Sequence, residues 1–138
     1  MKKTIWIAVV ILLMLGVWWF AKDPKTVDGE TIKIGGAFGL SGICAEFGEG
    51  ELRAVTLAIE EVNAAGGVNG KLLELITEDT QCENKTTVNA FQKLINVNRV
   101  SAIIGPTWGD SFQGGYAISQ KAKVVSVSPS TAIEALEI

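Results

Sequence analysis

The amino-acid sequence predicts an α/β fold organised around a parallel, doubly wound sheet. Short apolar segments alternate with longer segments whose apolar residues recur every three or four positions. This alternation continues from residue 31 to the end of the chain. Successive strand–helix pairs of this kind form parallel sheets, because each helix returns the chain to the edge at which the previous strand began.

The first strand is expected over residues 31–37, followed by a loop, residues 38–48, that contains Gly39 and Gly42. These glycines allow positive φ or the close approach of a ligand. Residues 51–65 then have the periodicity of a helix, with a single apolar stripe made of Leu52, Val55, Ile59 and Val62. The helix ends at a pair of glycines, 66 and 67, and an Asn-Gly turn leads into the next strand.

The second half of the chain repeats the pattern. A strand over residues 71–77 precedes a helix that Asn84 can cap, with a buried stripe of Val88, Phe91, Leu94 and Ile95. We expect a third strand at 100–104, a third helix at about 111–121, a fourth strand at 124–127 and then the start of a fourth helix. The carboxyl ends of the four strands therefore share one edge, where open α/β sheets bind ligands.

The first residues are expected to form a separate hydrophobic helix. Residues 5–21 are 17 apolar or small residues without a charge, preceded by two lysines. Such a helix is about 25 Å long, near the lower limit for a membrane span. The run lacks the small-x-small end of a cleaved signal peptide, and Trp18 and Trp19 suit a membrane interface, which favours an uncleaved anchor over a cleaved signal. Residues 1–27 are thus assigned to this segment and its linker, and residues 28–138 to an exported domain.

Composition excludes several function classes. The sequence has no histidine, which removes His-based triads, zinc-hydrolase helices and imidazole proton shuttles. After residue 21 there are 10 Lys and Arg against 15 Asp and Glu, so the exported part is mildly acidic and has no basic patch for nucleic acid. We therefore expect no catalytic residue, no metal and no cofactor.

Two cysteines are expected in neighbouring loops. Cys44 follows the first strand and Cys82 follows the second. If these strands are adjacent, both loops leave the same edge of the sheet, and a disulfide is geometrically plausible in an oxidising compartment. Two unrelated thiols are the alternative.

The loops at the shared edge carry hydroxyls, aromatic rings and carboxylates but no nucleophile beside a base. Gly109 leaves a backbone amide accessible just before a helix N-terminus, where a carboxylate would be stabilised. This set of groups suits the binding of a small polar or zwitterionic solute. Each group also has an ordinary explanation, since Ser and Thr often cap helices and aromatic rings often pack. The candidate ligand-binding residues are Phe47, Trp108, Gly109, Asp110, Ser111, Ser130 and Thr131.

Six segments resemble the periplasmic leucine/isoleucine/valine-binding protein family. The longest is AIEEVNAAGGVNG at 58–70, and the others, in order, are IKIG at 32–35, LSG at 40–42, EDTQC at 78–82, IIGP at 103–106 and VSVSPS at 125–130. The resemblance covers roughly residues 30–138. It implies an extracellular solute-binding component of an ABC importer, with an amino acid, an amide or urea as the solute and permease subunits as partners. A ligand-sensing ectodomain of a membrane receptor is the alternative that it leaves open.

The resemblance also implies roles for individual residues. The loop after the third strand would hold the solute's carboxylate, with the amide of Gly109 in place of the family's serine and Ser111 as a possible substitute. Ser130 and Thr131 would bind from the loop after the fourth strand, although Ala132 lacks the hydroxyl that is expected there. Phe47 corresponds to the aromatic residue that covers the ligand.

Two departures from the family concern sulfur and length. The cysteine that pairs with the equivalent of Cys82 lies at the position of Trp108 in the branched-chain binders, whereas this chain has Cys44 instead. Family members close two lobes around the solute, and residues 28–138 correspond to part of the first lobe. The acidic residue that meets the ligand's ammonium group usually lies in the second lobe. We therefore expect this chain to be a fragment of a longer protein, with a one-lobe module as the alternative.

Overall fold

The computed structural model describes residues 30–130, with the exception of the side chain of Asp110. Its main elements, in chain order, are β1 (Ile32–Phe38), α2 (Ala45–Ala64), β2 (Leu73–Asp79), α3 (Asn84–Gln92), β3 (Ala102–Ile104), α4 (Phe112–Ala122) and β4 (Val125–Val127). Three shorter helical segments are η1 (Gly42–Cys44), η2 (Lys93–Asn98) and η3 (Gly109–Ser111). The predicted alternation of strands and helices is confirmed over this range.

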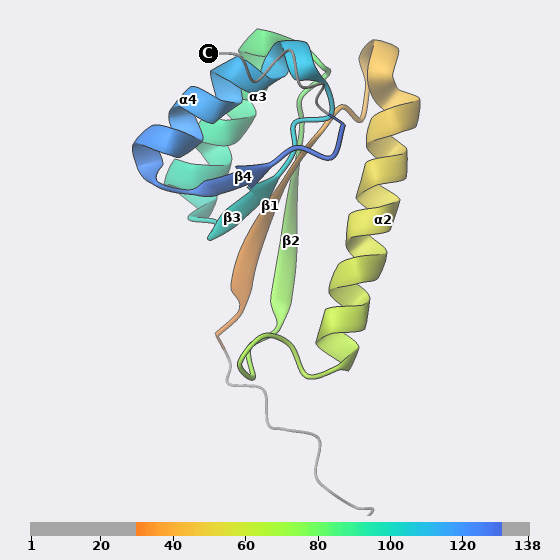
Figure 1. The fold of residues 1–138 in the computed structure, drawn as a ribbon, viewed down its shortest axis with the longest axis vertical. Coiled ribbons are helices and arrows are strands. Elements are labelled where there is room, and N and C mark those ends of the chain that lie inside the picture. Colours follow the sequence, from red (N-terminus) through yellow and green to blue (C-terminus); the bar gives the residue numbers. More distant parts are fainter. Residues whose placement is uncertain (1–29, 131–138) are drawn as a thin grey trace, which may run out of the picture.

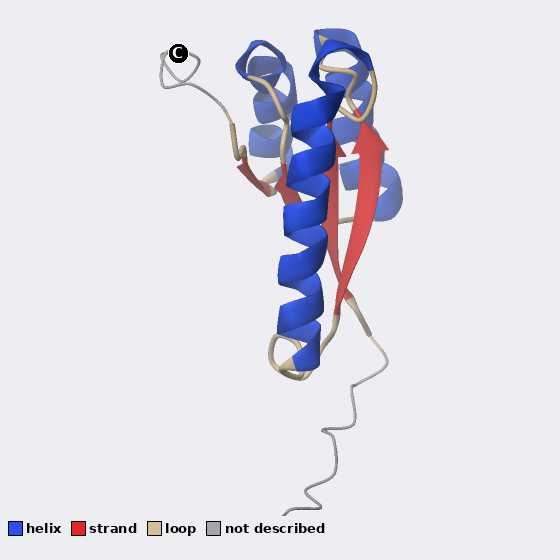
Figure 2. Cartoon of the chain, turned by 90° about the vertical axis from the view of Figure 1, so that its right-hand side faces the viewer, coloured by secondary structure: helices blue, strands red, loops and turns tan. Residues whose placement is uncertain are grey.

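The four strands form one sheet in the order β2-β1-β3-β4, and every pairing is parallel. β1 pairs with β2 at seven positions, from Ile32–Leu73 to Phe38–Asp79. Helix α2 covers one face of the sheet, whereas α3 and α4 lie side by side on the other face (Figures 1 and 2). The α/β class and the parallel sheet are confirmed.

The core lies between the sheet and the α3–α4 layer. Phe91 and Leu94 are one helical turn apart and fully buried, and they pack with Ala37 and Ile103 of the sheet and with Val100. Full burial of a large apolar side chain contributes roughly 1.5–3 kcal/mol. This cluster therefore holds β1 and β3, the two central strands, at a fixed position beneath α3.

Helix α2 begins earlier than the sequence predicts. The loop expected over residues 38–48 is confined to its first few residues, because η1 starts at Gly42 and α2 at Ala45. Gly48, the last residue of the expected loop, is a packing position within the helix: a Cβ there would overlap the carbonyl oxygen of Gly39. The helix needs this glycine to lie against the loop that follows β1. As a result, Phe47 lies on a helix and not on a loop.

Three smaller predictions are also corrected. Glu83, not Asn84, occupies the N-cap position of α3, and no side chain caps it. The helical stretch after α3 continues as a π-helical segment, η2, which ends at Arg99 with φ of 57°. β3 begins at Ala102, two residues later than expected, because the amide of Val100 bonds back to Leu94 of the preceding segment.

The predicted membrane anchor, residues 5–21, and the predicted fourth helix after residue 130 lie outside the described residues. Between residues 30 and 130, no helix is long and apolar enough to cross a membrane.

Candidate ligand-binding site

The strand order creates one place where the connections diverge. β1 and β3 are neighbours in the sheet, but the chain leaves β1 toward β2 on one side and leaves β3 toward β4 on the other. The first connection runs through α2 on one face, and the second runs through α4 on the opposite face (Figure 1). In open α/β sheets, a crevice opens at the carboxyl ends of two such strands, and ligands bind there.

A pocket of about 180 Å³ is located at this crevice. Phe47 of α2, Thr107 and Trp108 after β3, and Ser130 after β4 line it. The two aromatic rings have centroids 6.2 Å apart and planes inclined by 55°. Phe47 is 64% exposed and Trp108 is 41% exposed. Large apolar rings that remain exposed around a concave site indicate a surface that contacts something else.

Glu51 joins the polar side of the pocket into one network. The hydroxyl of Thr107 donates to Glu51 Oε2 at 2.6 Å, and the hydroxyl of Ser130 lies 2.6 Å from Oε1. Thr107 also accepts a hydrogen bond of 2.9 Å from the amide of Gly39, and Ser130 contacts the carbonyl oxygen of Thr107. The carboxylate of Glu51 therefore joins the loops that follow β3 and β4, and Thr107 extends the network to the loop that follows β1.

Asp79 performs a similar task between the β1 and β2 loops. It accepts hydrogen bonds from the amides of Leu40 (2.9 Å) and Gln81 (2.8 Å) and from the hydroxyl of Ser41 (2.6 Å). Burial alone would raise the pKa of Asp79, but the hydrogen bonds from Ser41 and the backbone outweigh that effect and lower the pKa below its ordinary value of 3.8. These donors favour the charged carboxylate.

Next to this carboxylate, the structure joins Cys44 and Cys82 in a disulfide, with a Cα–Cα distance of 6.3 Å. The bridge links the start of α2 to the loop after β2. Since β1 and β2 are neighbours, both cysteines lie at the same edge, as the sequence argument requires.

The structure brings together only part of the predicted site. Phe47, Trp108 and Ser130 meet at the pocket. Ser111 does not line this pocket: its side chain is buried, and its hydroxyl donates to the carbonyl oxygen of Trp108 at 2.9 Å. Gly109 is buried at the start of η3, which leads directly into α4. Thr131 and the side chain of Asp110 lie outside the described part of the chain.

Sequence reasoning missed Glu51 and gave no specific role to Thr107. On the sequence, Glu51 is one of several acids on the polar face of an amphipathic helix, and its spacing carries no signal. The only hint was its place one helical turn after Phe47, which puts both side chains on the same face of α2. Its role depends on residues 107 and 130, which the sheet order brings near α2.

Among residues 30–130, no group of three or more acidic or sulfur ligands is placed to hold a metal ion. Hydroxyls, a carboxylate, backbone amides and two aromatic rings form the site. These are groups that recognise polar and apolar parts of a small solute through hydrogen bonds and ring contacts.

Two curated proteins are similar in sequence to this chain. The "Leucine-, isoleucine-, valine-, threonine-, and alanine-binding protein" of Pseudomonas aeruginosa is 34% identical over 105 residues, which are 76% of this chain and 28% of that protein. The "Leu/Ile/Val-binding protein" of Escherichia coli is 27% identical over 72% of this chain and 27% of its own length. The chain thus spans little more than a quarter of these curated relatives.

Solved structures show the same relation. The branched-chain amino acid transporter substrate-binding protein LivJ from Streptococcus pneumoniae, solved in complex with isoleucine, superimposes with a TM-score of 0.73 at 36% identity. The match covers 75% of this chain and 30% of LivJ. The leucine-binding protein LivK from Thermotoga maritima gives a TM-score of 0.69 at 27% identity, covering 74% of this chain and 28% of LivK.

The sequence profile described as "Periplasmic binding protein" matches residues 31–137, which is nearly all of the chain beyond its N-terminal segment. The match includes every strand of the sheet and all four residues that line the pocket. By this match, the chain belongs to the periplasmic binding protein family.

Proposed function

We propose that this chain supplies part of the first lobe of an extracytoplasmic solute-binding protein. In this proposal the protein binds branched-chain or related amino acids, amides or urea between two lobes and delivers them to the permease of an ABC importer. The printed names of the relatives support the solute class, and family membership supports an extracytoplasmic location.

One observation carries the proposal: the pocket at the divergence of β1 and β3, with aromatic rings on one side and hydroxyls on the other. Its volume of about 180 Å³ is smaller than the roughly 300–1,000 Å³ of pockets for drug-sized ligands. This size suits an amino acid that has only one of its two binding surfaces in place.

In this proposal, groups around the pocket contact both the side chain and the carboxylate of the bound amino acid. Phe47 and Trp108 would cover the apolar side chain. The backbone amide of Gly109, at the start of η3, would stabilise the carboxylate, because an unpaired amide at a helix start favours an anion. Asp110, Ser130 and Thr131 would complete the polar part of the site.

The domain assignment is part of the same proposal. Residues 1–27 would anchor the protein to the cytoplasmic membrane or be removed as a signal segment, and residues 28–138 would belong to the solute-binding domain. A second lobe would close over the pocket, exclude water and provide the remaining hydrogen bonds.

Isothermal titration calorimetry of the intact protein tests the proposal. We would titrate L-leucine, L-isoleucine, L-valine, L-alanine, acetamide and urea separately. Saturable binding of at least one of these solutes is expected. Absence of saturable binding to all six, by a protein shown to be folded by circular dichroism, would refute the proposed function. Binding without any dependence of import on the protein would favour the sensory ectodomain.

A further inference from the structure

We propose that Glu51 determines which end of the solute this lobe binds: its carboxylate makes the polar wall of the pocket a receptor for an ammonium or other N–H donor. This inference rests on the proposed function, since it concerns the same pocket. It assigns the recognition of positive charge to the described lobe, through a side chain that does not line the pocket itself.

The hydrogen-bond count gives the first step. A hydroxyl has one hydrogen to donate and two lone pairs that accept. The hydrogen of Thr107 is used by Glu51, and one lone pair is used by the amide of Gly39. The hydrogen of Ser130 has two acceptors within reach, Glu51 and the carbonyl oxygen of Thr107. Both hydroxyls therefore offer acceptors, not donors, to a solute.

Exposure decides which hydroxyl meets the solute. Thr107 is only 3% exposed, whereas Ser130 is exposed beside the same pocket. Ser130 is the member of the hydrogen-bond network that a solute can reach, whereas the buried Thr107 holds the carboxylate of Glu51 in position. A ligand carboxylate placed against Ser130 would face lone pairs and a negative charge, which is unfavourable. An ammonium group at the same place would donate to the lone pairs and be attracted by the negative charge.

Charge gives the second step. Within residues 30–130, the ion pairs are Arg53–Glu49, Lys71–Glu30 and Lys93–Glu78, and none involves Glu51. The two hydroxyl contacts solvate the carboxylate but do not neutralise it. A partly buried carboxylate that has hydrogen-bond donors but no cation attracts a positive group more strongly than an exposed acid does.

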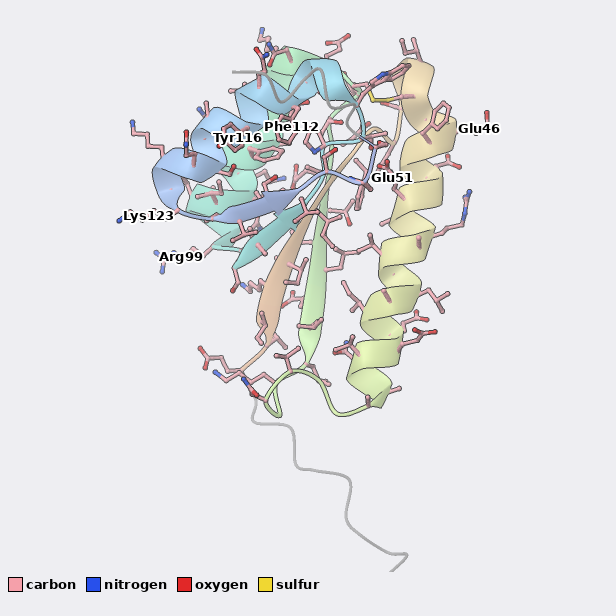
Figure 3. All side chains as sticks on the ribbon, in the orientation of Figure 1. Glu46, Glu51, Arg99, Phe112, Tyr116 and Lys123 are labelled. Atoms are coloured by element: carbon pink, nitrogen blue, oxygen red, sulfur yellow. A yellow bond between two sulfur atoms is a disulfide. The ribbon has the colours of Figure 1, made fainter. Side chains whose placement is uncertain are left out.

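The position of Glu51 on α2 differs from that of Glu46, another acid near the same helix end. Glu51 lies on the side of α2 that faces the strand ends, whereas Glu46 lies on the outer side (Figure 3). Glu46 is exposed and precedes Glu51 by five residues on the same helix. The pair offers a matched comparison, since replacing either one removes the same charge from α2.

The orientation of an amino acid follows from these two steps. Its carboxylate would lie toward the amides at the start of η3, and its ammonium group would lie toward Ser130 and Glu51. The side chain would then contact Phe47 and Trp108. The lobe would hold all three parts of the solute, and a solute without an N–H group would lose one of the three.

Three probes separate the ends of the solute: L-leucine, L-leucinamide, which lacks the carboxylate, and 4-methylpentanoate, which lacks the ammonium group. We would titrate each by calorimetry into the intact protein and into its E51Q and E46Q variants. E51Q is expected to lower the affinity for L-leucine and for L-leucinamide about tenfold or more, which is the scale of one hydrogen bond to a charged group. Binding of 4-methylpentanoate is expected to stay unchanged or become tighter, because glutamine can donate to a hydroxyl and release its hydrogen. E46Q is expected to stay within about twofold for every probe.

Each outcome is decisive. Equal affinities of E51Q and the unsubstituted protein for L-leucine would overturn the inference and leave the proposed function intact. Equal losses of affinity for all three probes in E51Q would also overturn the inference, because they would show that Glu51 has a purely structural role. If none of the amino acids and amides binds to the unsubstituted protein, both the proposed function and this inference are refuted. Should E51Q not fold, Ser130→Ala replaces it, since Ser130 is exposed, and the same selective loss for the two N–H probes is expected.

Discussion

Asp79 and Glu51 lie at the same edge of the sheet, and each collects donors from more than one loop, but the donors differ in kind. Asp79 accepts two backbone amides and one serine hydroxyl between the β1 and β2 loops, beside a disulfide. Glu51 accepts only hydroxyls, and both belong to residues that line the pocket. Backbone donors fix the course of the chain, whereas side-chain hydroxyls keep lone pairs that a ligand can use. We therefore infer that the β1–β2 side of the edge is a rigid support and that the β3–β4 side is the proposed binding surface.

The largest expected effect comes from removing the disulfide on the rigid side. A Cys44→Ala, Cys82→Ala double variant opens a loop of 38 residues, and the chain-entropy estimate for such a loop is about 4 kcal/mol. Urea denaturation under oxidising conditions should show this loss of unfolding free energy. Addition of a reductant should destabilise the unsubstituted protein to a similar extent and leave the double variant unchanged. Equal urea midpoints for the two proteins without reductant would contradict a stabilising bridge.

The second effect concerns Gly48, which lets α2 lie close to the loop that follows β1. Gly48→Ala places a Cβ against the carbonyl oxygen of Gly39 and is expected to cost roughly 1–3 kcal/mol. The matched control is Gly50→Ala on the same helix, where a Cβ meets no atom within 4 Å. That change should stabilise the protein by about 0.4–1 kcal/mol, since alanine favours a helix. Thermal unfolding of both variants distinguishes close packing from helix propensity; a loss at Gly50 equal to that at Gly48 would refute the packing explanation.

The third effect tests Asp79 through pH. Because the pKa of Asp79 is lower in the folded protein, its contribution to stability is fully present above its ordinary pKa of 3.8 and is lost as the pH falls through the folded value. Asp79→Asn should cost about 1–2 kcal/mol at neutral pH. The difference between the two proteins should shrink as urea midpoints are measured from about pH 6 down to pH 3. A difference that does not change with pH would show that the charge of Asp79 is unimportant.

The smallest change in stability is expected on the binding side. Trp108→Ala removes a partly exposed ring and should alter the unfolding free energy by about 1 kcal/mol or less. Solute affinity should nevertheless fall about tenfold or more, because the ring forms one wall of the pocket. The control is Ile43→Ala, whose side chain is exposed but does not line the pocket. A large loss of stability for Trp108→Ala with unchanged affinity would reverse the assignment of the two sides.

The sequence was sufficient for most of the architecture on which this comparison rests. Apolar periodicity located β1, β2 and α4 to within two residues, because these elements bury one regular face. The proximity of Cys44 and Cys82 followed from a single assumption about neighbouring strands. The start of α2 could not be predicted, since Gly48 and Gly50 are usual signs of a loop and only the contact with Gly39 explains Gly48 inside a helix.

The site was harder to predict than the fold. Exposed aromatic residues such as Trp108 are conspicuous in a loop after a strand, and the structure places this one at the pocket. Ser111 looked equally suitable, but its hydroxyl stays within its own turn, and sequence alone does not distinguish a local hydrogen bond from one to a ligand. Glu51 was missed because its partners are 56 and 79 residues away.

The strand order also bears on how the chain folds as it is made. Among the strands, β1 is synthesised first, yet it lies inside the sheet, where β2 pairs with it on one side and β3 on the other. The β1–α2–β2 unit is complete at Asp79, with one edge of β1 still open for β3. A chain that emerges N-terminus first can therefore build the rigid side, together with Phe47 and Glu51 on α2, before the other pocket residues, Thr107, Trp108 and Ser130, exist. Growth then continues outward through β3 to β4, so the pocket is completed on a support that is already folded.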